Sequence, residues 1–137
     1  MRRIIQQSVV LPASAEQLYE MYLDPIAHAA ITGRHVTIRA EEGAEFSAFD
    51  GQLSGVILAL ARPRLIVQSW RSFLFRDDDP DSMLILSFAP ETPDDKESRI
   101  VLVHLDVPEH DYADVTKGWH KYYWSPWLAY LQGQARQ

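Results

Sequence analysis

Apolar residues near the start of the chain follow first the pattern of a strand and then that of a helix. Residues 4–11 are mostly β-branched or apolar and end at Pro12, which predicts a strand. Residues 14–17 (SAEQ) have the form of a helix capping box, and apolar side chains follow them at helical spacing. Pro25 stops this helix and can begin another over 26–31. We therefore expect one strand followed by two short helices.

From residue 35 onward the apolar positions recur every second residue, which indicates half-buried strands. The pair Asp50-Gly51 predicts a tight hairpin turn, because both residue types tolerate positive φ angles. A short alternating stretch surrounds Val36. The longer strands are expected over 44–49, 52–60, 65–75, 83–88 and 99–107.

Residues 111–133 have the periodicity of one long C-terminal helix with an aromatic face. Pro126 lies inside this helix, where it removes a hydrogen bond and crowds the carbonyl of Tyr122, so we expect a kink or a break there. On a helical wheel one face holds Tyr112, Val115, Trp119, Tyr122, Tyr123, Pro126 and Tyr130.

The order of these elements predicts an α+β fold. A curved, mainly antiparallel sheet of about six strands would carry the long C-terminal helix over its concave face, with the two short N-terminal helices at one end. The length of 137 residues fits a single domain over 1–137.

Composition excludes several classes of function. The net charge is −6 and the pI is near 5.2, which argues against nucleic acid or an anionic membrane surface as a partner. The chain has no cysteine, which rules out disulfides and thiolate metal sites and agrees with a cytoplasmic location. No phosphate-binding loop, nucleophile elbow or metal-ligand spacing occurs, so we expect neither a metal nor another cofactor.

His104 is a candidate for acid–base chemistry. It shares one face of a predicted strand with Asp106. His104 can therefore be a general base in a cavity, with its ring oriented by a carboxylate. The alternative is a histidine at the edge of the core that is hydrogen-bonded to a neighbour. No catalytic residue is assigned on this pattern.

The aromatic residues can form either a packed core or the lining of a cavity. Three hydroxyls and an indole N–H on one buried helix face each need a partner, which suits a partly hydrated cavity that accepts a ligand. Arg71, next to Trp70, can hold an anionic group or point to solvent. The candidate lining residues are Trp70, Trp119, Tyr123, Phe46, Phe88 and His104.

Trp124 falls on the opposite side of the predicted helix, near Lys117 and Lys121. An exposed tryptophan at that position would contact another chain or the short helices. We therefore name Trp124 as the candidate for a partner contact.

Several motifs together resemble one known family. The hairpin FSAFDGQLSG (46–55), the strand IVQSWR (66–71) and the helix GWHKYYW (118–124) occur in the order and spacing of the activator-of-heat-shock-protein-ATPase homologue family. The chain is similar to its C-terminal-domain type, over residues from about 3 to 132. That family belongs to the START/SRPBCC helix-grip superfamily, so the resemblance implies the helix-grip fold.

The resemblance implies less about function. Eukaryotic members are co-chaperones whose separate N-terminal domain makes the principal chaperone contact, and this chain is expected to correspond to their second domain only. The family shares no set of catalytic residues, so none is carried over. Val101 and Val103 stand where members commonly have Thr on the outer strand face, and they would form an apolar patch that could pair in a dimer. The chain is thus expected to be a monomer or a homodimer.

Three hypotheses about function follow. The leading one is a small cytoplasmic helix-grip protein that binds a small hydrophobic ligand between the sheet and the C-terminal helix. The second is a protein-binding module associated with a chaperone. The third is an enzyme of the cyclase, dehydratase or hydrolase kind that uses His104. The resemblance favours a binding protein over an enzyme.

Overall fold

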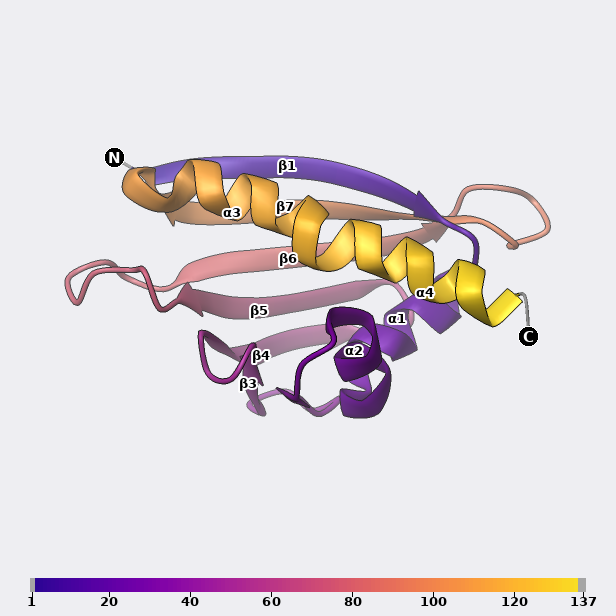
Figure 1. Cartoon of the computed structure of the whole chain (residues 1–137), viewed down its shortest axis with the longest axis horizontal. Coiled ribbons are helices and arrows are strands. Elements are labelled where there is room, and N and C mark those ends of the chain that lie inside the picture. The colour runs from indigo at the N-terminus through magenta and orange to yellow at the C-terminus, as the bar shows by residue number, and fades with distance from the viewer. Residues whose placement is uncertain (1, 136–137) are drawn as a thin grey trace.

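The computed structural model describes residues 2–135 of the chain (Figure 1). The strands are β1 (Arg2–Leu11), β2 (Val36–Thr37), β3 (Glu45–Ala48), β4 (Leu53–Ala61), β5 (Leu65–Ser72), β6 (Ser82–Pro90) and β7 (Ser98–Pro108). The N-terminal helices are α1 (Ala15–Leu23) and α2 (Pro25–Thr32). The C-terminal helical region consists of the 3-10 turn η1 (Glu109–Asp111), α3 (Tyr112–Gly118), the π-helical segment η2 (Trp119–Trp124) and α4 (Ser125–Ala135).

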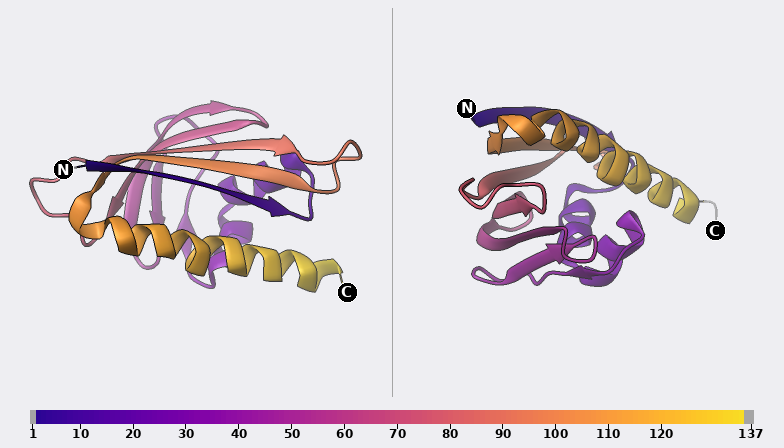
Figure 2. Two further views of the ribbon diagram at one scale, coloured as in Figure 1. Left: turned by 90° about the horizontal axis from the view of Figure 1, so that it is seen from above. Right: turned by 60° about the vertical axis from the view of Figure 1, so that its left-hand side comes forward.

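All seven strands form one antiparallel sheet in the order β1-β7-β6-β5-β4-β3-β2. The first strand pairs with the last, so that Gln6 lies opposite Val103. The sheet is curved, and the C-terminal helix crosses its concave face (Figures 1 and 2). The predicted α+β helix-grip architecture is confirmed. The strand beyond the expected six is β2, which has only two residues.

The two short helices begin as the sequence predicts. The Ser14 side chain accepts a hydrogen bond from the Gln17 amide at 3.0 Å and caps α1. Asp24 then caps α2, and Gly33 ends it with a φ of 78°, a conformation that glycine adopts at little cost. The helix α1 packs on β6, and α2 packs on α4, so both fill one end of the space between the sheet and the C-terminal helix (Figure 2).

The C-terminal helix differs from the prediction around Pro126. The expected break is wrong, since the ribbon continues without interruption (Figure 1). The backbone instead widens into a π turn just before the proline. The Ser125 amide donates to the carbonyl of His120, five residues earlier. A π turn rotates the following side chains relative to an α-helix, so the predicted aromatic face does not persist. Among the described residues no helix is long and apolar enough to cross a membrane.

Candidate functional site

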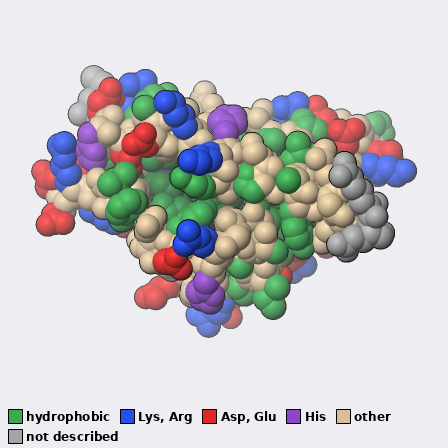
Figure 3. Space-filling model, in the orientation of Figure 1, with side chains coloured by type: hydrophobic (Ala, Val, Ile, Leu, Met, Phe, Trp, Pro, Cys, Tyr) green, Lys and Arg blue, Asp and Glu red, His purple; other side chains and the backbone are tan. Residues whose placement is uncertain are grey.

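A cavity of about 650 Å³ opens between β5 and the first half of the C-terminal helix, beside the end of α2. The space-filling view shows a hollow lined by hydrophobic side chains, with charged groups around it (Figure 3). This volume is typical of sites for small molecules. The lining residues are Thr32, Arg34, Phe49, Gln52, Leu53, Trp70, Ser72, Phe73, Leu74, Asp111, Asp114, Val115, Lys117, Gly118, Trp119, Lys121, Tyr122 and Tyr123.

The buried side of the cavity carries polar groups. Trp70 and Ser72 lie two residues apart on β5, and both side chains face the core because strand side chains alternate. Asp111, at the start of the C-terminal helix, is buried there too. Burial raises the pKa of Asp111, and the nearby Ser72 hydroxyl opposes this shift. We call Trp70, Ser72 and Asp111 the floor of the cavity.

One wall of the cavity comes from the turn between β3 and β4. The predicted hairpin at Asp50-Gly51 is confirmed, with φ angles of 57° and 86°, and Phe49 has a φ of 52° as well. This left-handed conformation costs a non-glycine residue roughly 1–2 kcal/mol. It places the Phe49 ring edge-to-face against Tyr122 and Tyr123, with ring centroids 5.4 and 6.2 Å apart. The turn thus holds an aromatic contact between the sheet and the helix.

The six candidate lining residues divide into two groups. Trp70, Trp119 and Tyr123 line the cavity. Phe46, Phe88 and His104 are buried but are not part of its lining. Phe88 packs against Tyr19 of α1, and Phe46 packs against Tyr22 and His28.

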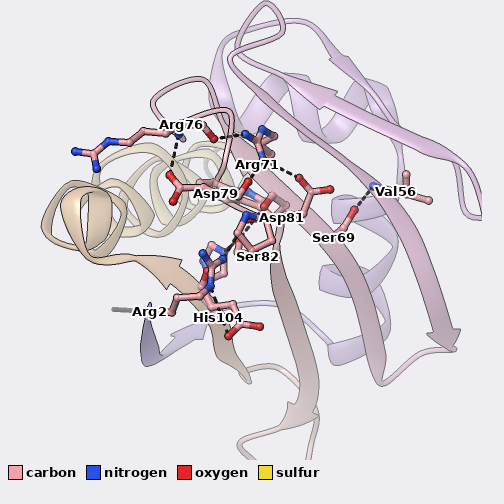
Figure 4. Close-up of polar contacts among 12 residues, drawn as sticks. Arg2, Val56, Ser69, Arg71, Arg76, Asp79, Asp81, Ser82 and His104 are labelled. Carbon is pink, nitrogen blue, oxygen red and sulfur yellow. Dashed lines mark hydrogen bonds and ion pairs between the residues drawn. The ribbon is translucent and has the colours of Figure 1, made fainter.

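His104 is held between partners that use both of its ring nitrogens. Trp119 Nε1 can only donate, and it lies 3.2 Å from Nδ1, so Nδ1 is the acceptor. Nε2 therefore carries the proton and donates to the Ser82 hydroxyl at 2.8 Å, and Ser82 donates to the Trp70 carbonyl (Figure 4). Burial lowers the pKa of His104 to about 3. His104 is a neutral residue that orients Trp119, and its use as a general base is not supported.

The predicted pairing of His104 with Asp106 is wrong. Asp106 has a φ of 62°, and the register of β7 against β1 shifts between Arg3 and Ile5. The alternation of strand side chains therefore fails after His104. The Asp106 carboxylate turns to solvent and lies beside Arg2 instead.

A second buried histidine lies behind the cavity and has no counterpart in the predicted sites. His28 Nδ1 donates to the carbonyl of Tyr22 at 2.7 Å, so Nε2 is free to accept from the Tyr123 hydroxyl at 2.9 Å. Burial lowers the pKa of His28 to about 4 and raises that of Tyr123. The Tyr22 hydroxyl in turn bonds to the buried Gln68. This network fixes the Tyr123 side chain in the cavity wall.

Trp124 is not an exposed residue, so it offers no surface for a partner. Its side chain is only 4% exposed, and its indole donates to Gln7 of β1 at 2.8 Å. It stacks between Trp119 and Trp127, with ring centroids 5.6 and 6.4 Å apart. The π turn explains this result, because it brings Trp124 onto the sheet and leaves Tyr122, predicted on the core face, 46% exposed.

Arg71 points away from the cavity, as strand alternation predicts for a neighbour of Trp70. Its guanidinium donates to the carbonyls of Asp79 and Arg76, both at 2.7 Å, and to the Asp81 carboxylate at 3.1 Å (Figure 4). Arg71 thereby closes the loop 73–81, whose first residues lie at the mouth of the cavity.

The outer sheet face carries the predicted apolar patch. Val101 is exposed and Val103 half-buried there. Ile85 lies between Val103 and Val67 in neighbouring strands, which extends the patch across three strands. Pairing of two copies through this patch stays a prediction.

The floor and the turn contain the site residues that sequence reasoning missed. The hairpin pattern identifies the turn, but no periodicity shows that Phe49 faces the helix. Asp111 was expected only as the first residue of the helix. Its contact with Ser72 joins residues 39 positions apart (111 − 72 = 39), which no local pattern reveals.

Fold and cavity together define the class of this protein. A curved antiparallel sheet that grips a long C-terminal helix, with a cavity between them, is a helix-grip domain. The chain belongs to the family described as Activator of Hsp90 ATPase homolog 1-like protein, whose model matches residues 12–126.

Individual relatives agree with this assignment. The human activator of 90 kDa heat shock protein ATPase homolog 1 is 26% identical over 110 residues, which cover 80% of this chain and 31% of the human protein. The chain therefore spans about a third of the length of that relative. An HSP90 activator from Plasmodium falciparum has a TM-score of 0.78 at 17% identity, covering 88% of this chain and 89% of that one.

A third relative has the same fold. The Aha1 dimer from Colwellia psychrerythraea has a TM-score of 0.73 at 10% identity, covering 88% of this chain and 90% of that one. At these identities the two solved structures establish the shared fold alone.

Proposed function

We propose that this chain binds a small, largely apolar molecule in the cavity between β5 and the C-terminal helix. The observation that carries the proposal is the cavity of about 650 Å³, with Trp70, Trp119 and Tyr123 in its lining. Apolar surface removed from water contributes about 25 cal/mol per Å², so aromatic walls of this kind supply affinity without charge pairing. The buried networks around His28 and His104 hold these walls in place before the ligand arrives.

Native mass spectrometry of protein purified under mild conditions tests this proposal. We expect a mass above that of the chain from a copurified ligand, and the same spectrum gives the number of subunits. Gly118 lines the cavity, and a Cβ added there would meet only the Tyr122 ring, at 3.6 Å. Gly118→Leu should therefore fill part of the cavity and abolish the added mass.

Gly133→Leu is the matched control, because Gly133 lies on the same helical region with nothing within 4 Å of its added Cβ. It should keep the ligand. A wild-type protein that carries no ligand and takes up none from a cell extract would contradict the proposal.

A second candidate function is association with a 90-kDa chaperone. Family membership and the exposed apolar side chains at the mouth favour it, since Phe73 is 63% and Leu74 48% exposed. A pull-down of the host chaperone should lose the complex in Phe73→Ser/Leu74→Ser. Ile26→Ser is the control, because Ile26 is 80% exposed on α2 and outside the mouth. Equal recovery by both variants, or no recovery by the wild type, counts against this function.

A further inference from the structure

We infer that the molecule bound in the cavity carries a hydroxyl group, which accepts a hydrogen bond from the Trp70 indole and donates one to the Asp111 carboxylate. This inference rests on the proposed function, because it describes the ligand of the same cavity. It is carried by two polar atoms of the floor residues that have no hydrogen-bond partner in the described part of the chain.

Trp70 Nε1 and Asp111 Oδ2 are buried, and neither has a hydrogen-bond partner within residues 2–135. Both residues line the cavity, and they are only 5% and 2% exposed. A buried polar atom without a partner costs about 1–3 kcal/mol. Most buried polar groups in proteins are paired, so an unpaired donor and an unpaired acceptor on two residues of one cavity lining call for a partner from outside the chain.

The two atoms belong to one neighbourhood. Trp70 and Ser72 lie on the same face of β5, where residues two apart are neighbours. Ser72 and Asp111 both line the cavity, and the Ser72 hydroxyl lies close enough to influence the Asp111 carboxyl. The donor on Trp70 and the acceptor on Asp111 therefore flank the same serine.

The chemistry of the two atoms selects among ligand groups. A hydroxyl both accepts and donates, so one hydroxyl can pair with the indole N–H and with the carboxylate. A carboxylate can accept from Trp70, but its charge is repelled by Asp111. An ammonium group can donate to Asp111 and cannot accept from Trp70. A pure hydrocarbon leaves both atoms unpaired.

The rest of the ligand faces aromatic walls. Phe49, Trp119 and Tyr123 surround the space above the floor, which suits a flat ring. The two floor atoms are shielded from water, and the Trp70 ring packs edge-to-face against Phe75, with ring centroids 6.0 Å apart. Side chains around the floor must therefore move before the ligand reaches these atoms. The inferred ligand is a ring-bearing alcohol or phenol.

Four probes on one skeleton test the inference: 2-naphthylmethanol, 2-methylnaphthalene, 2-naphthoate and 2-naphthylmethylammonium. Titration calorimetry gives the dissociation constants, and the ¹H–¹⁵N spectrum follows the indole N–H groups of the four tryptophans. We expect the alcohol to bind about tenfold more tightly than the hydrocarbon and the two ions. The alcohol should also move the Trp70 indole resonance downfield, whereas the hydrocarbon should not.

Trp70→Phe keeps an aromatic ring, although a smaller one, and removes the indole donor, so it should abolish the preference for the alcohol over the hydrocarbon. Trp127→Phe is the matched control, because its indole nitrogen is also buried and unpaired but lies outside the cavity lining. It should keep the preference. Asp111→Asn should raise the affinity for 2-naphthoate about tenfold, whereas Asp114→Asn, at the exposed mouth, should change it little.

Equal binding of the alcohol and the hydrocarbon by the wild type would overturn the inference and leave the proposed function intact. It would mean that an ordered water, not the ligand, pairs with the floor. A preference that survives in Trp70→Phe would overturn it as well. If no probe binds, the proposed function fails together with the inference. If Trp70→Phe does not fold, the shift of the Trp70 resonance in the wild type decides.

Discussion

Lowering the pH from 7 to 5 should reduce the free energy of unfolding, because the folded chain keeps two buried histidines neutral. The ordinary pKa of histidine is about 6.5. In the folded chain burial lowers the pKa of His104 to about 3 and that of His28 to about 4. Between these values and 6.5 the unfolded chain binds protons that the folded chain does not, so stability falls as the pH falls through this range.

The size of the effect follows from these pKa values. At pH 5 each histidine disfavours the folded state by about 2 kcal/mol relative to neutral pH, and the two together by about 4 kcal/mol. Domains of this size are stable by about 5–15 kcal/mol, so the loss is a large share. The raised pKa of Asp111 acts in the opposite direction, because the folded carboxyl binds its proton more readily.

Urea unfolding followed by tryptophan fluorescence at pH 7, 6 and 5 measures the free energy of unfolding directly. His104→Gln or His28→Gln, whichever folds, should halve the loss between pH 7 and 5. His120→Gln should leave it unchanged, because His120 is exposed. A loss below about 1 kcal/mol in the wild type, or an NMR titration of His104 near 6.5, would refute the reasoning.

Three further predictions concern the packing of the fold. Gly55→Ala should cost about 3 kcal/mol or more in urea unfolding, because its Cβ would lie 1.9 Å from a backbone oxygen of β5, whereas Gly133→Ala should stabilise by about 0.5–1 kcal/mol. Trp124→Phe should lower the free energy of unfolding by about 1–3 kcal/mol, because the hydrogen bond to Gln7 is lost. It should not reduce the amount of chaperone recovered in the pull-down. A reduced recovery by a variant that is fully folded would contradict the buried position of Trp124. Arg71→Met should speed hydrogen exchange in the loop 73–81 while β5 stays protected, and unchanged exchange would contradict its role in closing that loop.

The cavity was predicted from the sequence only in outline. Trp70, Trp119 and Tyr123 line it because each lies on the core face that its own period predicts. Phe88 has the same period but is covered by Tyr19 of α1, and Phe46 is covered by α1 and α2. Which core-facing aromatic residues meet a ligand depends on where the short helices pack, and the local pattern does not contain that information.

The C-terminal helix was likewise predicted only in part. A wheel of 3.6 residues per turn predicts Trp124 on the exposed side, whereas the π turn before Pro126 places it in the core. The proline was visible in the sequence. The backbone's response to it was not, because a broken helix and a π turn both relieve the clash between the proline ring and the preceding turn.

By itself the sequence determined the order of the elements, the antiparallel sheet and the helix that crosses it. Hydrophobic periodicity, caps and turn residues act over a few neighbouring residues, so they can be recognised along the chain. Tertiary structure alone decided the chemistry of the site. His104 became a neutral partner of Trp119, and Asp111 joined Ser72 and Trp70 at the floor, because burial and pairing of polar groups depend on residues that only the folded chain brings together.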